Sequence, residues 1–154
     1  MWQRIQTVYI LLAVVACVVC LCMPIAEIIP ERMGASDTVY NLLTFKADGT
    51  TETPICSIIG FILLLSVASE SVGTLLLYKH RKKQAKFCLG AVVFTLLWNI
   101  IFGICAFSGL ADHGGEMKPT FASCLPFVAM VLFFLARKAI LKDEAKVRAA
   151  DRIR

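Results

Sequence analysis

The sequence predicts an all-α fold: an integral membrane, antiparallel four-helix bundle with a C-terminal cytoplasmic helical extension. First, 58% of the 154 residues are hydrophobic, whereas a typical soluble chain has about 45–50%. Second, the hydrophobic residues form four blocks, each close to the roughly 20 residues that a membrane-spanning helix needs. Third, the cations and the acids gather in different connections between the blocks. We therefore expect one membrane domain over residues 1–154.

The first predicted span covers residues 5–23. An arginine followed by an apolar run also resembles a secretory signal, and residues 14–17 resemble the box that precedes a lipoprotein cysteine. However, the apolar run continues to Met23, beyond the roughly 7–15 residues of a signal core. We therefore expect an uncleaved helix that ends at Pro24.

Residues 24–54 form the larger predicted external loop. Within it, residues 38–45 have the composition of a strand, and Asp48-Gly49 is typical of a hairpin turn. Two interpretations remain open. The segment could be a small hairpin on the outer membrane face, or an irregular loop with Tyr40 and Phe45 at the interface.

A short basic hinge joins the second and third predicted spans, residues 55–78 and 87–107. Its cations cannot enter hydrocarbon, and so short a connection forces the flanking helices to lie antiparallel. The topology-setting cations are Lys79, Arg81, Lys82, Lys83 and Lys86. Under the positive-inside rule they place the hinge on the cytoplasmic side.

The fourth predicted span covers residues 119–136, after a short outer loop, residues 108–118, whose glycines predict no regular structure. Pro119 suits a first helical turn. Pro126 lies inside the apolar run, so it predicts a kink. The tail after residue 136 lacks Gly and Pro, which predicts that the helix continues through residues 139–154.

The remaining charges agree with cytoplasmic termini. Thirteen of the 16 Lys and Arg residues lie in the hinge, at the N-terminal tip or after residue 136, whereas the two external loops contain seven of the 11 acids. In the tail, Lys142, Lys146 and Arg148 could contact anionic lipid headgroups at about 1 kcal/mol each. Alternatively, the tail is a solvated helix that only anchors topology. A contiguous basic face on a soluble domain is absent, so we expect no nucleic acid partner.

Most of the seven cysteines lie inside apolar runs, where thiols behave as small apolar side chains. A disulfide could form in an oxidising compartment among four of them, and the sequence leaves the connectivity open. These four are Cys22, Cys56, Cys105 and Cys124.

Glu70 is the one acid inside a predicted span, and such residues mark a functional site or a buried partner. Residues four apart line one face of a helix, which gives a candidate intramembrane polar seam. The seam consists of Ser66, Glu70 and Thr74 on the second span and Thr95 and Asn99 on the third. Counting from the hinge places Glu70 level with Thr95, and Ser66 level with Asn99. In a structural interpretation, neutral Glu70 donates a hydrogen bond to Thr95 or Asn99. In a functional one, it is a proton or cation site.

Common catalytic and cofactor-binding motifs are missing from the sequence. It contains no phosphate-binding glycine loop, no nucleophile–base pair at a recognisable spacing and no His-Glu-x-x-His. We therefore expect no enzymatic activity, no cofactor and no bound metal.

Both tips of the chain resemble one known family. The chain opens Trp2-Gln3-Arg4-Ile5-Gln6 and ends with Lys-Asp-Glu at 142–144, Val-Arg at 147–148 and Ala-Asp-Arg at 150–152. These segments are similar to a bacterial family of four-span inner-membrane proteins, domain of unknown function 4293, in which Ile usually stands at position 2. The resemblance implies the fold and a bacterial inner-membrane location. It implies no activity and no functional residues.

The sequence favours a membrane-embedded interaction or assembly component without catalytic activity. The alternative is a subunit of a small oligomeric transporter or channel that uses Glu70 as a proton or cation site. The expected partners are the lipid bilayer, with anionic lipid contacts by the tail, and either another membrane protein or further copies of the chain.

Overall fold

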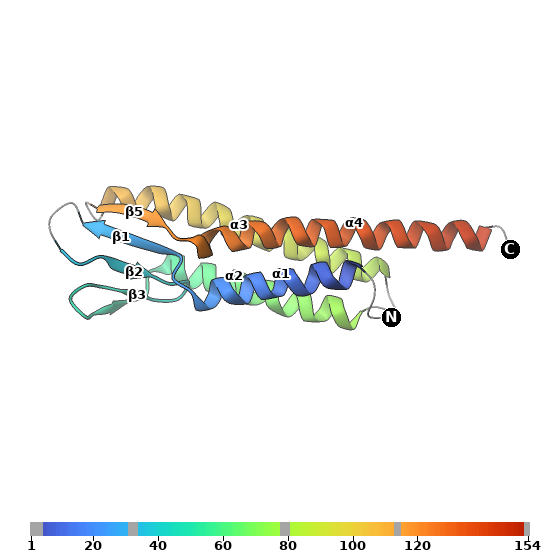
Figure 1. Ribbon diagram of the computed structural model, residues 1–154, viewed down its shortest axis with the longest axis horizontal. Coiled ribbons are helices and arrows are strands. Elements are labelled where there is room, and N and C mark those ends of the chain that lie inside the picture. Colours follow the sequence, from blue (N-terminus) through green and yellow to red (C-terminus); the bar gives the residue numbers. More distant parts are fainter. Residues whose placement is uncertain (1–4, 31–33, 78–80, 113–114, 153–154) are drawn as a thin grey trace.

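Four long helices dominate the computed structural model, which describes residues 5–30, 34–77, 81–112 and 115–152. They are α1 (Ile5–Cys22), α2 (Ile55–Leu76), α3 (Arg81–Asp112) and α4 (Leu125–Arg152). All four are long and apolar enough to cross a membrane. The helices lie antiparallel: α4 packs against α1 and α3, and α2 packs against α3 and α1 (Figure 1).

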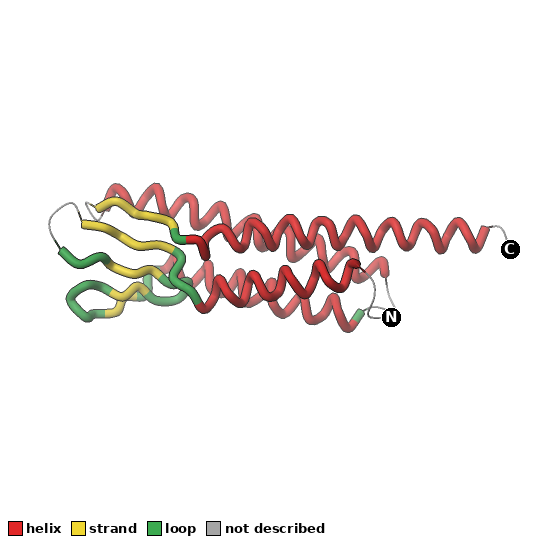
Figure 2. The backbone as a smooth tube through the Cα atoms, viewed as in Figure 1, coloured by secondary structure: helices red, strands yellow, loops and turns green. Residues whose placement is uncertain are grey.

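A five-stranded antiparallel sheet covers one end of the bundle, which makes the predicted all-α fold incomplete (Figure 2). The strands are β1 (Ala26–Pro30), β2 (Asp37–Val39), β3 (Thr44–Phe45), β4 (Thr51–Glu52) and β5 (Gly115–Pro119), in the order β4-β3-β2-β1-β5. We call this end of the bundle the sheet end, and the opposite end, where α4 continues, the tail end.

Of the two interpretations of residues 24–54, the hairpin is present, as β3 and β4. The strand-like residues 38–45 form parts of two antiparallel strands, β2 and β3, rather than one strand. Gly49 has a φ of +82°, a left-handed conformation that glycine adopts without steric cost. The Gly49 N–H donates to the Lys46 carbonyl, and the Lys46 N–H donates to the Thr50 carbonyl. The Asp48-Gly49 turn therefore joins the two strands as its sequence predicts.

The prediction that residues 108–118 lack regular structure is wrong at both ends. α3 continues to Asp112, and β5 pairs with β1 from Ala26↔Pro119 to Pro30↔Gly115. The short, glycine-containing segment shows no alternation that would reveal a strand. It is ordered by pairing with a strand that lies far from it in the sequence.

The basic hinge is shorter than predicted because α3 begins at Arg81 rather than residue 87. Residues 81–86 contain good helix formers and neither Gly nor Pro, so the helix extends into them. Lys82, Lys83 and Lys86 are exposed on its first turns. Lys79 lies outside the described residues.

The start of α4 also differs from the prediction. Pro119 ends β5, a short 3-10 helix η1 (Phe121–Cys124) follows, and Pro126 is the second residue of α4. A proline in the first turn lacks only an N–H that has no helical partner anyway, so the predicted kink is replaced by a helix start. The predicted continuation into the tail is confirmed to Arg152.

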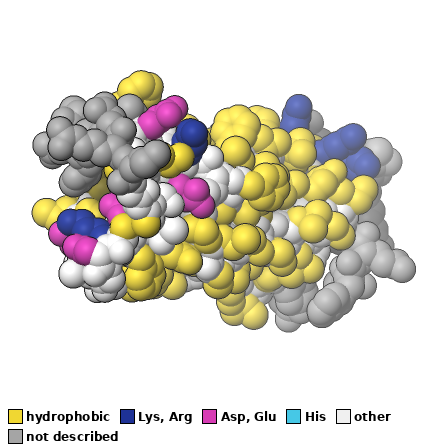
Figure 3. Space-filling model, turned by 60° about the vertical axis from the view of Figure 1, so that its left-hand side comes forward, with side chains coloured by type: hydrophobic (Ala, Val, Ile, Leu, Met, Phe, Trp, Pro, Cys, Tyr) yellow, Lys and Arg dark blue, Asp and Glu magenta, His cyan; other side chains and the backbone are white. Residues whose placement is uncertain are grey.

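The interior of the bundle is filled mainly by small side chains between the helices, including Ala13, Cys17, Ala91, Ala129 and Ala136. Small residues let helices approach closely, as they do in membrane bundles. Some large side chains, such as Trp98 and Phe133, are buried as well, but many others point outward, among them Leu12, Ile62, Leu96 and Phe134. Figure 3 shows apolar side chains covering the middle of one face, with acids near the sheet end. This exposed apolar belt suits contact with a lipid bilayer.

Candidate functional site

Asn41 closes the sheet end of the bundle and is 1% exposed. Its Nδ2 donates to the Cys20 carbonyl of α1 at 2.6 Å, and its Oδ1 accepts from Trp98 Nε1 of α3 at 3.1 Å. Gly60 of α2 provides the space, because a Cβ there would lie 3.2 Å from Trp98 Nε1. We call Asn41, Cys20, Trp98 and Gly60 the Asn41 lock. It joins the loop between β2 and β3 to three helices.

The Asn41 lock was not predicted from the sequence. In the sequence, the lock includes an asparagine between strand-like residues, a tryptophan in one span and a glycine in another. Each of these residues is common in such a position, so none of them alone predicts a contact. Only the fold brings them together, since 57 residues separate Asn41 from Trp98.

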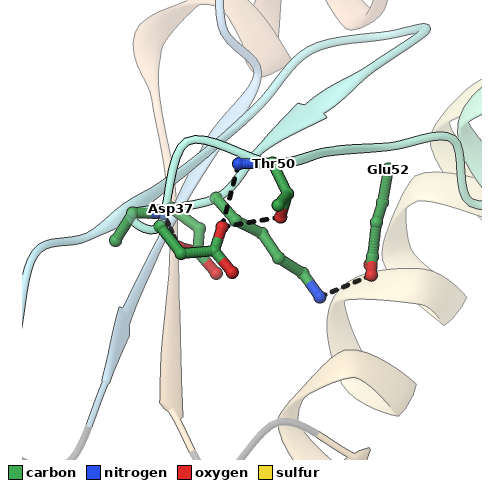
Figure 4. Close-up of polar contacts among 6 residues, drawn as sticks. Asp37, Thr50 and Glu52 are labelled. Carbon is green, nitrogen blue, oxygen red and sulfur yellow. Dashed lines mark hydrogen bonds and ion pairs between the residues drawn. The ribbon is translucent and has the colours of Figure 1, made fainter.

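Exposed polar contacts order the hairpin beyond the lock (Figure 4). Lys46 Nζ pairs with Glu52 across the strands, and Asp37 accepts a hydrogen bond from the Ala47 N–H at 2.8 Å. Asp48 accepts from both the N–H and the hydroxyl of Thr50, and these hydrogen bonds hold the pKa of the Asp48 carboxyl below its usual value. These contacts stabilise the turn itself and offer no enclosed site.

The predicted polar seam lies on the α2 and α3 helices, but its α2 members form no hydrogen bond with its α3 members, all of which are among the described residues. Four of its side chains donate to the carbonyl four residues earlier in their own helix. These donors are Ser66, Thr74, Thr95 and Asn99. Of them, Thr74 and Thr95 are buried.

Glu70 faces Gly90 rather than Thr95. A Cβ at Gly90 would lie 2.7 Å from Glu70 Oε2, so the glycine makes room for the carboxyl group. The predicted hydrogen bond of Glu70 to Thr95 or Asn99 is therefore not formed. Glu70 was predicted opposite Thr95 by counting from the hinge. Because α3 begins six residues before the predicted start, a residue earlier in the sequence than Thr95 faces Glu70.

Arg137 of α4 lies near Cys88 of α3. The sequence did not predict that this arginine reaches the interior of the bundle. The Thr74 hydroxyl hydrogen-bonds the Cys88 side chain, and both Glu70 and Arg137 interact electrostatically with Cys88. We call these four residues, Glu70, Thr74, Cys88 and Arg137, the interior polar cluster. It connects α2, α3 and α4 near the tail end.

Two atoms of the interior polar cluster are buried without a hydrogen-bond partner among the described residues. They are Glu70 Oε2 and Arg137 Nε, and Gln6 Oε1 on α1 shares this property. Buried polar atoms are usually hydrogen-bonded, so each exception needs an explanation. Glu70 and Arg137 are half-buried, and both interact with the Cys88 thiol. Together these groups are candidates to bind a proton, a water molecule or a small ion. The described residues contain no group of three His, Cys, Asp or Glu that could hold a metal.

The α2–α3 connection is held by a hydrogen bond near the hinge. Gln84 is buried, and its Nε2 donates to the Thr74 carbonyl at 3.2 Å. Because Thr74 also contacts Cys88, the hydrogen bond from Gln84 connects the hinge to the interior polar cluster. The exposed hinge lysines are thus attached to a firmly packed helix pair.

Comparison with known proteins identifies a family. The model of a family described as a domain of unknown function (DUF4293) matches residues 2–153. The chain therefore belongs to this family, as the resemblance of its two tips predicts. None of the curated proteins matches it.

Proposed function

We propose that this DUF4293 protein is a non-catalytic assembly component of a bacterial inner membrane, with both termini in the cytoplasm. The observation that carries the proposal is the length of α4. Its last fully buried side chain among those described is Ile140, yet the helix continues to Arg152. Twelve further residues extend about 18 Å, farther than the roughly 6 Å of headgroup layer on each side of a bilayer.

The exposed surface of this extension supports a binding role. Lys138, Lys142 and Lys146 are exposed and are spaced four residues apart, so they form one stripe along the helix. Lys138 lies nearest the apolar belt, where an anionic headgroup can reach it. Lys146 lies beyond the headgroups, where an acidic surface of a partner protein can contact it.

A photo-crosslinking amino acid placed at position 146 tests the assembly role. We expect a crosslink to a different protein, identified by mass spectrometry, and its loss in a Lys138→Glu/Lys142→Glu background. The matched control is the same crosslinker at exposed Val147, about 100° around the helix, where the yield should fall. Crosslinks only between copies of this chain would contradict the proposal.

The proposed orientation has its own test. Reporter fusions after residues 82 and 150 should place both positions in the cytoplasm, because the hinge and tail cations favour that side. A fusion after residue 49, in the hairpin, should report the opposite side. Fusions that place residues 82 and 150 in different compartments would refute the four-span topology.

The interior polar cluster favours a second candidate function, a subunit of a small oligomeric transporter or channel. Its support is that, within the part of the chain that the structure describes, Glu70 Oε2 and Arg137 Nε are both buried without a hydrogen-bond partner. A carboxyl group and a guanidinium group that both interact with one thiol can exchange a proton or a small ion. Four helices enclose little space, so a transport path would require several copies.

Glu70→Gln separates these candidates, because the amide keeps the size of the side chain and removes its titration. If Glu70 only fills space beside Gly90, the variant folds and the cellular phenotype of the protein is unchanged. If Glu70 carries a proton or ion, the variant folds and the phenotype disappears. Ser66→Ala, one turn away on the same helix, is the control that should change neither.

A further inference from the structure

Two thiols meet at the sheet end of the α2–α3 pair. Cys56 is the second residue of α2, and Cys105 lies on the part of α3 that faces it. The two side chains hydrogen-bond each other. Both cysteines are present as thiols, Cys56 exposed and Cys105 half-buried.

The helix register supports this pairing independently of the thiol contact. Gly60 faces Trp98, Glu70 faces Gly90, and Gly73 faces Phe87. As the residue number on α2 falls from 73 to 60 toward the sheet end, the number of the facing residue on α3 rises from 87 to 98. The same register continues to Cys56 and Cys105, so their proximity follows from the packing of the whole helix pair.

We propose that Cys56 and Cys105 are a redox-sensitive disulfide site that links α2 to α3. The oxidant is a small-molecule or protein disulfide. The exposed Cys56 thiolate attacks one sulfur of that disulfide, forms a mixed disulfide and releases the first thiol. The Cys105 thiolate then attacks Cys56 Sγ and releases the second thiol. Two protons leave the cysteines, and two electrons pass to the oxidant.

The link would hold the sheet end of the bundle closed. Cys56 lies four residues, about one turn, from Gly60 of the Asn41 lock. A covalent bond between α2 and α3 at this point restrains the helices on either side of the Trp98 ring. The sequence allowed any pairing among four cysteines, whereas the contact selects one.

The test uses the purified full chain in detergent, oxidised with glutathione disulfide and then denatured in the presence of a maleimide mass tag. The chain has seven cysteines, so the reduced protein takes seven tags. We expect the oxidised protein to take five and to yield a linked peptide containing Cys56 and Cys105. Cys56→Ser and Cys105→Ser should each abolish the linked peptide.

Cys22→Ser and Cys124→Ser are the matched controls, because both remove exposed thiols near the same end and should leave the link intact. Seven tags after oxidation, or a linked peptide joining any other pair, would overturn the proposal. Intermolecular dimers through Cys56 would overturn it too. Oxidation of the purified protein depends neither on membrane orientation nor on a partner, so this result is separate from the outcome of the crosslinking and fusion experiments.

Discussion

The Asn41 lock and the interior polar cluster both place polar side chains inside the bundle, but they differ in whether the buried polar atoms have hydrogen-bond partners. In the lock, the Asn41 amide donates to the Cys20 carbonyl and accepts from Trp98 Nε1. In the cluster, Glu70 Oε2 and Arg137 Nε have no hydrogen-bond partner among the described residues. A satisfied buried network makes a structure rigid and specific, whereas an unsatisfied one is costly. The difference indicates that the lock is structural and that the cluster is the better candidate for chemistry.

Breaking the lock should have the largest effect on stability. Asn41→Leu leaves the Trp98 indole N–H and the Cys20 carbonyl without their partner, and each unsatisfied group costs about 1–3 kcal/mol. We expect a loss of about 3 kcal/mol in the free energy of unfolding, measured by denaturation in detergent. Asn99→Leu is the control, since the Asn99 amide donates only to its own helix at the Thr95 carbonyl. Equal losses of unfolding free energy in both variants would show that the hydrogen bonds of the lock stabilise the protein no more than a bond within one helix does.

The space beneath the Trp98 ring gives a second way to disturb the lock. At Gly60, an added Cβ would lie 3.2 Å from Nε1 of a ring that is already held by a hydrogen bond. Overpacking of this kind costs about 1–3 kcal/mol, so Gly60→Val should lower the melting temperature clearly. Gly103→Val is the matched control, because no atom of the described residues lies within 4 Å of a Cβ at Gly103. An unchanged melting temperature in Gly60→Val would mean that the Trp98 indole can move to make room for the added side chain.

Gly90 allows the same experiment on the interior polar cluster, with a smaller expected cost. An added Cβ would approach the Glu70 carboxyl at 2.7 Å. This carboxyl is the end of a flexible side chain, and no described residue hydrogen-bonds its Oε2. Gly90→Ala should therefore cost less than about 1 kcal/mol while it displaces Glu70. Reaction of Glu70 with a hydrophobic carbodiimide should change in this variant. Gly73→Ala, which meets Phe87 at an ordinary 3.7 Å, should leave that reaction unchanged.

The exposed hairpin should show the smallest effect. Two hydrogen bonds from Thr50 lower the pKa of Asp48, so the charged carboxylate stabilises the turn. This stabilisation is present above the unfolded pKa of about 3.9 and is lost as the pH falls through the lower folded value. The protection factors of the β3 and β4 amides, which correct hydrogen exchange for its intrinsic pH dependence, should fall below that pH, and Asp48→Ala should remove this fall. Protection factors that do not change with pH in the unaltered protein would contradict this account.

Local patterns in the sequence were sufficient to predict the four helices and the β3–β4 turn. Each apolar block is long enough to span a bilayer, and Asp48-Gly49 has a strong turn preference of its own. Boundaries were predicted less well where neighbouring residues are good helix formers, as at Arg81, or where a strand needs a distant partner, as at Gly115. The polar seam contained Glu70 but placed it opposite the wrong residue, because its depth was counted from the wrong helix start.

The sequence alone determined that the chain has four helices long and apolar enough to span a membrane, since helix formation and membrane insertion depend on contiguous residues. It also identified the family through the two tips of the chain. Tertiary structure decided the pairing of β1 with β5, the hydrogen bonds of Asn41 to α1 and α3, and the approach of Arg137 and Glu70 to Cys88. It also brought Cys56 to Cys105. Each of these contacts joins segments far apart in the sequence, and their geometry depends on how the helices pack.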